Sequence, residues 1–329
     1  HQNLSSNALT LHEIWAFEDG DILLHALPIY HVHGLFVALH CALMNGSSIH
    51  FLDKFDPDTV ISLLSQSTVM MGVPTFYTRL LAETAFTSEV SKNIRLFVSG
   101  SAPMLAETHV QFTERTGHKI LERYGMTEGG MITSNPYDGD RVPGTVGPAL
   151  PDVEVRICAK DGTPVAAGEI GVLEYKGPNL FKGYWGMPEK TAEEFRSDGF
   201  FISGDNAIMD IDGRVSIVGR DKDLIITGGY NVYPKEIEIE IDQMDGVIES
   251  AVIGLPHKDF GEGVTAVVVA KDDGGVTEDA IIDALKDKLA RFKQPKKVYF
   301  VPELPRNAMG KVQKNALRLP ERIALYRFL

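Results

Sequence analysis

Residues 21–125 alternate between short apolar segments typical of strands and longer segments typical of helices, which limits the folds open to this chain. Strands are predicted at 21–28, 48–52, 68–73 and 94–99, and another begins at 119–121. A helix over 32–45 ends at a glycine, Asp56 and Pro57 open a second helix, and a third is expected over 104–116. Strand–helix–strand connections with short links imply an α/β fold, a parallel sheet with helices on both faces.

The pattern changes twice further along the chain. From about 140 to 218 Gly and Pro recur and the predicted strands are short, which indicates a β-rich subdomain. From 221 onward the pattern is α+β, with helices at 234–244 and 277–292. We therefore predict an α/β part at 1–139, a β-rich subdomain at 140–219 and a C-terminal α+β domain at 220–329, with the domain boundary at 219–222.

Charge and cysteine usage exclude several classes of protein. The net charge of −13 argues against non-specific nucleic-acid binding, which needs basic patches. No apolar run is long enough for a membrane helix. Cys41 and Cys158 lie far apart and outside any metal-binding spacing, as expected for thiols in a reducing compartment. We expect a cytoplasmic protein; the sequence begins without Met, so organellar targeting stays open.

Ligands of parallel α/β sheets bind at the carboxyl ends of the strands, which here are 28–31, 72–74, 100–103 and 124–127. In the last of these segments, the Thr127 hydroxyl can donate to a phosphate, and the following Glu128 can hold Mg²⁺. An ordinary polar turn is the alternative. Small residues at 100–103 let a flat ligand approach the backbone, although most such loops are only turns.

Three further residues are candidates for ligand contacts. Asp205, on a glycine turn, can accept hydrogen bonds from two ribose hydroxyls, or it can simply cap the turn. Arg220 offers a fork of donors at the predicted domain boundary, unless this segment is a solvated linker. Lys311 follows a glycine in a loop, and its flexible ammonium suits an anion that changes shape during a reaction. Taken alone, it would be a surface lysine.

Five motifs thus occur together in one chain, at 100–103, 124–128, 203–205, 219–238 and 305–311. In this combination the chain resembles the adenylate-forming superfamily of acyl-CoA synthetases, luciferases and peptide-synthetase adenylation domains. The resemblance covers essentially all of 1–318. It implies that a carboxylate attacks ATP, with Mg²⁺ present, to give an acyl-adenylate and pyrophosphate. A small, mobile C-terminal domain then rotates, and CoA displaces AMP.

The resemblance also implies a role for each matching residue. Lys311 would contact the α-phosphate and the reacting carboxylate, Glu128 would hold Mg²⁺ with Thr127 as a phosphate ligand, and His31 would act as a gate near the acyl carboxylate. The remaining matches concern nucleotide and thiol binding. The adenine side is matched by Gly100, Ser101, Ala102 and Tyr124, cofactor binding more generally by Gly125 and Met126, the ribose by Asp205 and Arg220, the hinge by Lys222, and the thiol tunnel by Gly228 and Gly229.

The sequence departs from the family in one respect. The family's phosphate-binding loop precedes the segment that begins here at His1, and part of the large N-terminal domain is missing. We expect the chain by itself to bind ATP poorly and to be less stable than a complete enzyme. The sequence leaves the oligomeric state open.

The acid substrate is predicted from residues beside the expected pocket. Segments 27–35 and 71–81 most resemble malonyl-CoA synthetases, and Arg79 offers a cation for a second substrate carboxylate. Met104 would line the same pocket. Arg79 could instead pair with Glu83 on the same helix. We therefore expect malonate or methylmalonate, with another acyl- or aryl-CoA ligase, a carrier-loading adenylation domain or an inactive scaffold as alternatives.

Overall fold

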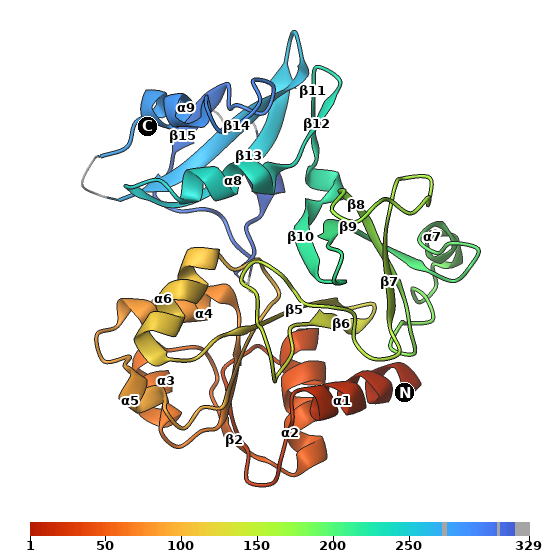
Figure 1. Ribbon diagram of the computed structural model, residues 1–329, viewed down its shortest axis with the longest axis vertical. Helices are drawn as coiled ribbons and strands as arrows, with labels where there is room; N and C mark the ends of the chain where they lie inside the picture. The colour runs from red at the N-terminus through yellow and green to blue at the C-terminus, as the bar shows by residue number, and fades with distance from the viewer. Residues whose placement is uncertain (272–274, 308–309, 320–329) are drawn as a thin grey trace. The chain divides into compact units, whose positions relative to one another are not determined.

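The computed structural model describes residues 1–271, 275–307 and 310–319, and in it the chain divides into two units (Figure 1). One unit comprises His1–Ser203 and Ala207–Ile217, and the other comprises Gly204–Asn206 and the residues from Val218 onward. The division runs through two strands, β9 (Phe201–Met209) and β10 (Val215–Arg220), so that Asp205 and Arg220 both belong to the second unit.

A six-stranded sheet in the first unit confirms the predicted α/β fold. Its strand order is β2-β1-β3-β4-β5-β6. The strands are β1 (Ile22–His25), β2 (Ser48–Phe51), β3 (Val69–Gly72), β4 (Leu96–Ser99), β5 (Leu121–Met126) and β6 (Gly130–Ser134). The first five pair in parallel, whereas β6 returns antiparallel to β5 through a tight turn.

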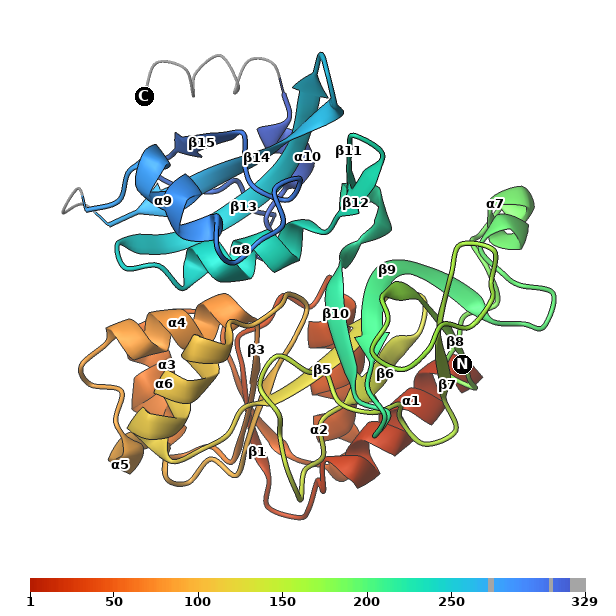
Figure 2. The same cartoon turned by 45° about the horizontal axis from the view of Figure 1, so that its top comes forward.

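Helices cover both faces of this sheet, as Figures 1 and 2 show. On one face lie α3 (Pro57–Leu64), α4 (Pro74–Ala82), α5 (Ser88–Ser91) and α6 (Ala106–Thr116); on the other lie α1 (Gln2–Ile14) and α2 (His40–Asn45). Asp56 caps α3 by accepting from the Thr59 N–H at 3.0 Å, as its sequence predicts. Tyr77, Phe97 and Phe112 pack edge to face in the core beneath α4 and α6.

The helix predicted over 32–45 is divided in two. A π-helix, η1 (His33–Leu39), precedes α2, and this wider turn departs from the regular helix that the sequence indicates. Gly34 lies so close to the preceding loop that a Cβ there would come within 2.3 Å of the Pro28 carbonyl oxygen. Gly46, with φ of 68°, ends α2 in the left-handed region, as expected.

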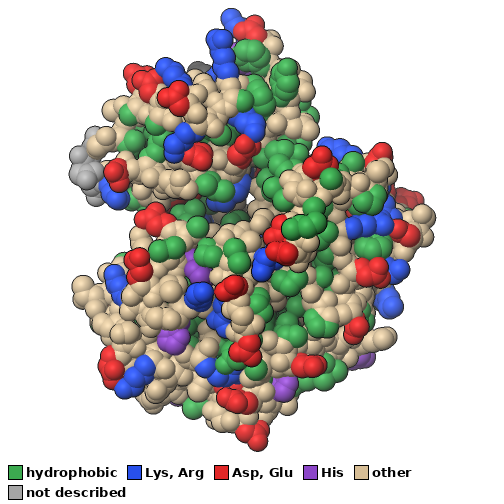
Figure 3. Space-filling model, in the orientation of Figure 1, with side chains coloured by type: hydrophobic (Ala, Val, Ile, Leu, Met, Phe, Trp, Pro, Cys, Tyr) green, Lys and Arg blue, Asp and Glu red, His purple; other side chains and the backbone are tan. Residues whose placement is uncertain are grey.

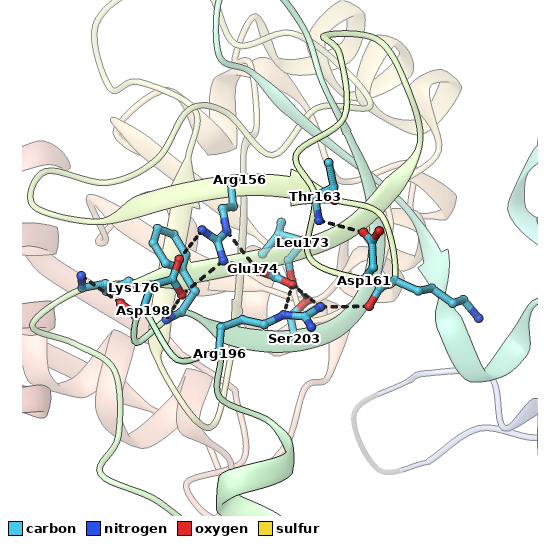
Figure 4. A network of polar contacts seen from close by, with 11 residues as sticks. Arg156, Asp161, Thr163, Leu173, Glu174, Lys176, Arg196, Asp198 and Ser203 are labelled. Carbon is cyan, nitrogen blue, oxygen red and sulfur yellow. Dashed lines mark hydrogen bonds and ion pairs between the residues drawn. The ribbon is translucent and has the colours of Figure 1, made fainter.

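A four-stranded sheet of order β10-β9-β8-β7 forms the β-rich part, with β7 (Glu154–Cys158), β8 (Gly171–Lys176) and a short outer helix, α7 (Pro188–Glu193). The buried carboxylate of Glu174 on β8 lies between two guanidinium groups (Figure 4). Arg156 reaches it at 2.8 Å and Arg196 at 2.7 Å, and Arg156 also pairs with Asp198 at the surface. These ion pairs join β7 and β8 to the segment after α7.

The second unit contains a five-stranded sheet. β12 (Tyr230–Val232), β11 (Ile225–Thr227), β14 (Gly261–Ala270) and β13 (Val247–His257) follow in that order, and β15 (Lys297–Phe300) pairs with β14. Alternate side chains of β13 and β14 face two cores. One core includes α8 (Pro234–Asp242) and α9 (Glu278–Leu285), and the other includes α10 (Lys314–Leu317). A 3-10 turn, η2 (Asp221–Asp223), precedes β11.

The long helix predicted over 277–292 is wrong, because α9 ends at Leu285. The next residues form separate turns, in which Lys286 N–H donates to Asp283 and Lys293 N–H donates to Ala290. The side chain of Gln294 donates to the Leu289 carbonyl at 2.9 Å. Side-chain hydrogen bonds thus satisfy carbonyl groups that a continuous helix would have bonded.

Charged side chains of both signs lie among one another on the face drawn in Figure 3. Within the described ranges, no helix is long and apolar enough to cross a membrane.

We predict that Glu174→Ala lowers the free energy of unfolding by about 3–5 kcal/mol, because it leaves two guanidinium groups without their shared buried partner. Asp198→Ala is the matched control: its carboxylate is half-exposed and screened by water, so its loss should be much smaller. Urea denaturation of both variants measures the difference. Equal losses would show that burial of Glu174 does not govern the network.

Candidate functional site

The loops after β1, β3, β4 and β5 meet at one edge of the parallel sheet, because these four strands are neighbours and point the same way. The predicted site segments 28–31 and 100–103 lie in these loops, whereas 72–74 and 124–127 include the last residues of β3 and β5. Gly100 N–H donates to the Gly72 carbonyl at 3.3 Å, and Ser101 Oγ lies 3.3 Å from His33 Nδ1. The structure therefore brings together segments that are up to about a hundred positions apart in the sequence.

The loop after β4 is both crowded and strained. Ser101 has φ of 70°, a left-handed conformation that side chains other than Gly, Asn and Asp seldom adopt. A Cβ at Gly100 would lie 2.2 Å from Nη1 of Arg123. A side chain at this position would therefore displace the guanidinium of Arg123.

Arg123, in the middle of β5, is a functional candidate that the sequence analysis missed. Its residue is 3% exposed, and neither Nε nor Nη2 has a hydrogen-bond partner among the described residues. Burial lowers the pKa of this guanidinium to about 9. A buried cation without a paired anion is unfavourable, so an anionic ligand at this position would be stabilised.

His33, the first residue of η1, lies near enough to Arg123 to feel its charge, and His31 precedes it by two positions. His31 is half-buried, and its Nδ1 accepts from the His33 N–H at 3.2 Å. His33 is fully buried, and burial, followed by the charge of Arg123, holds its pKa well below the usual value. His33 is thus neutral at pH 7, and its Nε2 has no hydrogen-bond partner in the described part of the chain. The predicted gating role of His31 stays a prediction.

Glu128 and Thr127 lie in the turn between β5 and β6, where Thr127 is exposed and Glu128 is half-buried. Phe181 N–H donates to the Glu128 carbonyl at 2.8 Å, and the Asn179 amide donates to the Gly129 carbonyl at 2.7 Å. No group of three His, Cys, Asp or Glu side chains suited to a metal is found among the residues described. Glu128 therefore fits Mg²⁺ only where phosphate oxygens and water complete the coordination.

Arg123 is followed along β5 by Tyr124, Gly125 and Met126. A bulge between Tyr124 and Gly125 interrupts the pairing of β5 with β6. A bulge re-aims neighbouring side chains, and such irregularities are frequent beside active sites. The predicted contacts of Tyr124 and Ala102 with the adenine, and of Gly125 and Met126 with the cofactor, stay predictions.

The other substrate candidates differ in their surroundings. Arg79 is exposed on α4, and no ion pair with Glu83 is present among the described residues. Met104 is buried in the core below α4 and α6. Their contact with an acid stays a prediction, although Met104 already has a packing role and Arg79 is not desolvated.

In the second unit, the predicted ribose pair is in contact: Arg220 Nε lies 2.8 Å from Asp205 Oδ1, and the Asp205 side chain is buried. Lys222 is exposed in η2. Gly228 and Gly229 have φ of 57° and 83°, as a two-residue hairpin between β11 and β12 requires.

Lys311 belongs to the same unit as Asp205 and Arg220. Its N–H donates to Asn307 Oδ1 at 3.0 Å, and its carbonyl accepts from the Asn307 N–H at 2.9 Å. The backbone at Lys311 is therefore fixed in a turn while the side chain remains half-exposed. This arrangement suits a lysine that meets a ligand.

Comparisons with known proteins agree with this arrangement. Residues 1–185 match the family described as AMP-binding enzyme, and residues 236–311 match the AMP-binding enzyme C-terminal domain. The chain is 39% identical to a malonate–CoA ligase of Arabidopsis thaliana, covering 97% of this chain and 57% of the relative. It is 36% identical to a feruloyl-CoA synthase of an Amycolatopsis species, covering 97% and 65%.

Among solved structures, ATP-bound MatB from Rhodopseudomonas palustris superposes with a TM-score of 0.96 at 59% identity, covering 99% of this chain and 65% of that chain. The chain thus spans between 57% and 65% of the length of these relatives.

We predict that Gly100→Ala lowers the free energy of unfolding by about 1–3 kcal/mol, because the new methyl group would overlap the Arg123 guanidinium. The loss should shrink in an Arg123→Ala background, where the overlapping group is gone. Urea denaturation of the two single variants and the double variant measures this coupling. Additive losses would mean that Gly100 is constrained by something other than Arg123.

A second prediction concerns Glu122, which is buried on the opposite side of β5 and accepts from the Gly144 N–H at 3.3 Å. Burial raises the pKa of this carboxyl to about 7. The native state therefore keeps a proton that the unfolded chain releases near pH 4.5. The stability contribution is full below about pH 4.5 and is lost as the pH rises through about 7.

Measuring the free energy of unfolding from pH 4 to pH 8 tests this, with Glu122→Gln as the comparison. The variant should lose the decline that the wild-type chain shows between these pKa values. Parallel curves for the two proteins would contradict the prediction.

Proposed function

The chain belongs to the AMP-binding enzyme family, and on this basis we propose that it serves an ATP-dependent acid–CoA ligase that activates malonate or methylmalonate. The similarity to a malonate–CoA ligase and to ATP-bound MatB supports this substrate class. The similarity to a feruloyl-CoA synthase favours an aryl acid as the second candidate. Free, buried Cys41 and Cys158 support a cytoplasmic location, where thiols stay reduced.

The observation that carries the proposal is the buried Arg123 beside Gly100 and His33. One carboxylate of a dicarboxylic acid is consumed in the reaction, and the other remains ionised. Two vacant donors of a desolvated guanidinium suit that second carboxylate, because it would accept from both donors and neutralise the buried cation. Acetate and ferulate have no second carboxylate, so neither would neutralise Arg123.

The proposed reaction has two steps. A carboxylate oxygen of the acid attacks the α-phosphorus of ATP, the bond from that phosphorus to the bridging oxygen breaks, and pyrophosphate leaves. The sulfur of CoA then attacks the acyl carbon, the bond to the AMP oxygen breaks, and AMP leaves while the thiol proton passes to solvent.

Named residues would support each step. The ammonium of Lys311 would stabilise negative charge as it develops around the α-phosphate. Asp205 would accept hydrogen bonds from the ribose, with Arg220 holding its carboxylate in place at 2.8 Å. Mg²⁺, held by Glu128 and nucleotide phosphates near Thr127, would supply charge neutralisation for the leaving pyrophosphate.

The test is a competition among acids. The chain is supplied with ATP, Mg²⁺, CoA and equal concentrations of malonate, methylmalonate, acetate and ferulate, and its thioester products are quantified by mass spectrometry. We expect malonyl- or methylmalonyl-CoA to dominate. Isothermal titration of malonate and acetate measures the same preference without turnover. A preference for ferulate or acetate in both measurements would contradict the proposed substrate.

We predict that Arg123→Met lowers the preference for malonate over acetate by about two orders of magnitude, because two charge-assisted hydrogen bonds are lost. It should not lower the free energy of unfolding of the ligand-free chain, since it replaces an unpaired buried cation by an apolar side chain. Arg79→Met is the matched control. Loss of preference in the Arg79 variant alone would assign the second carboxylate to Arg79.

A further inference from the structure

The hydroxyl of Tyr184 lies between two carboxylates. Its oxygen is 3.0 Å from Glu128 Oε1 and 2.8 Å from Glu194 Oε2. Tyr184 lies in the segment between β8 and α7, and Glu194 follows the last residue of α7. The phenol therefore joins the turn that carries Glu128 to a helix more than sixty positions further along the chain.

The ring of Tyr184 is held from several sides. The Phe181 ring meets it edge-on with centroids 4.8 Å apart, and Lys190 Nζ lies 5.4 Å from the centre of its face. Tyr184 N–H donates to Thr191 Oγ1 at 3.0 Å. Lys190 also pairs with Glu194. The hydroxyl is thus held in place by contacts that do not involve Glu128.

A count of protons shows what this arrangement demands. A phenol has one proton to donate, and both neighbouring carboxylates are acceptors when ionised. An ordinary phenol is protonated at neutral pH, so the hydroxyl is a donor. Only one of the two short contacts can be a donated hydrogen bond at any moment. Glu194 already has a cationic partner in Lys190, so Glu128 is the carboxylate that depends on the hydroxyl.

We propose that Tyr184 is a positioning residue for Glu128: its hydroxyl donates to Glu128 and holds the carboxylate in the orientation in which it meets a divalent cation bound with the nucleotide. Glu194, whose charge Lys190 offsets, is the alternative acceptor of the same hydroxyl. The inference rests on the proposed function, in which Glu128 lies beside nucleotide-bound Mg²⁺.

The backbone of the same segment supports this role. Phe181 N–H holds the Glu128 carbonyl, and the Asn179 amide donates to the carbonyls of Gly129 and Met131 at 2.7 and 2.9 Å. Residues 179–184 therefore fix the turn by its backbone and the carboxylate by its side chain. A carboxylate fixed in advance loses less conformational freedom when it meets a cation.

The test compares the affinity of the 329-residue chain for ATP in excess Mg²⁺ and in EDTA by isothermal titration calorimetry. The dissociation constant in EDTA divided by the dissociation constant in Mg²⁺ measures the contribution of the metal to ATP binding. Tyr184→Phe removes only the hydroxyl and keeps the ring against Phe181. We expect this variant to lower the quotient about five- to tenfold, because Glu128 loses the hydrogen bond that orients its carboxylate for the cation.

Two controls separate positioning from other effects. Glu194→Gln removes a charge but keeps the hydroxyl on Glu128, so its quotient should stay within about twofold of wild type. Tyr299→Phe, in the second unit, should leave the quotient unchanged. Thermal unfolding checks that Tyr184→Phe retains the fold, with a Tm within about 2 °C of wild type.

The outcomes distinguish this inference from the proposed function. A wild-type chain whose ATP affinity does not respond to Mg²⁺ overturns the proposed function and this inference with it. A wild-type chain that responds, with an equal response in Tyr184→Phe, overturns the inference alone. Equal losses of the quotient in Tyr184→Phe and Glu194→Gln also overturn it. In that case the negative charge around the turn, and not the hydroxyl, would determine the response to Mg²⁺.

Discussion

Parallel pairing of β1, β3, β4 and β5 requires each connection to cross the sheet and return, so all four strands release their loops at the same edge. The contacts of the first unit's candidate site depend on this geometry. Gly100 N–H donates to the Gly72 carbonyl, and Ser101 contacts His33, because neighbouring parallel strands end at the same edge of the sheet. The crowding of Gly100 by Arg123 follows from the pairing of β4 with β5. A shift in strand register would therefore separate the proposed acid-binding residues.

The buried charges show why Arg123 differs from the rest. Among the described residues, the charged side chains that are buried are Asp21, Glu122, Arg123, Glu174, Asp205 and Glu238. Most have an ion-pair partner: Asp21 pairs with Arg95, Glu174 with Arg156 and Arg196, Asp205 with Arg220, and Glu238 with Lys314. Burial raises the pKa of the Glu122 carboxyl to about 7, so this group keeps its proton below that pH. Arg123 cannot release its proton at neutral pH, so a ligand is the remaining source of an opposite charge.

The sequence identified the strand ends and the cap at Asp56 because these depend on local patterns: apolar runs, Gly and Pro positions and capping residues. It missed Arg123 because a single arginine inside a strand gives no local sign of which face is buried or what lies opposite. Its neighbour Tyr124 was noticed for its motif alone. Tyr184 was missed for the same reason, since its partners lie ten and fifty-six positions away. The helix predicted over 277–292 is too long, because α9 ends at Leu285 and the residues after it form separate turns.

One hairpin links the two chemical tasks proposed for the first unit. Arg123 would bind the acid from the middle of β5, and Glu128 would hold the metal five positions later in the turn to β6. A bulge at Tyr124 and Gly125 lies between them, and a Cβ at Gly125 would come within 2.1 Å of the Gly130 carbonyl oxygen. The two sites therefore share a stretch of backbone with little room to adjust. Since residues 179–184 hold the turn at one end and Gly100 confines Arg123 at the other, the positions of acid and metal are set together.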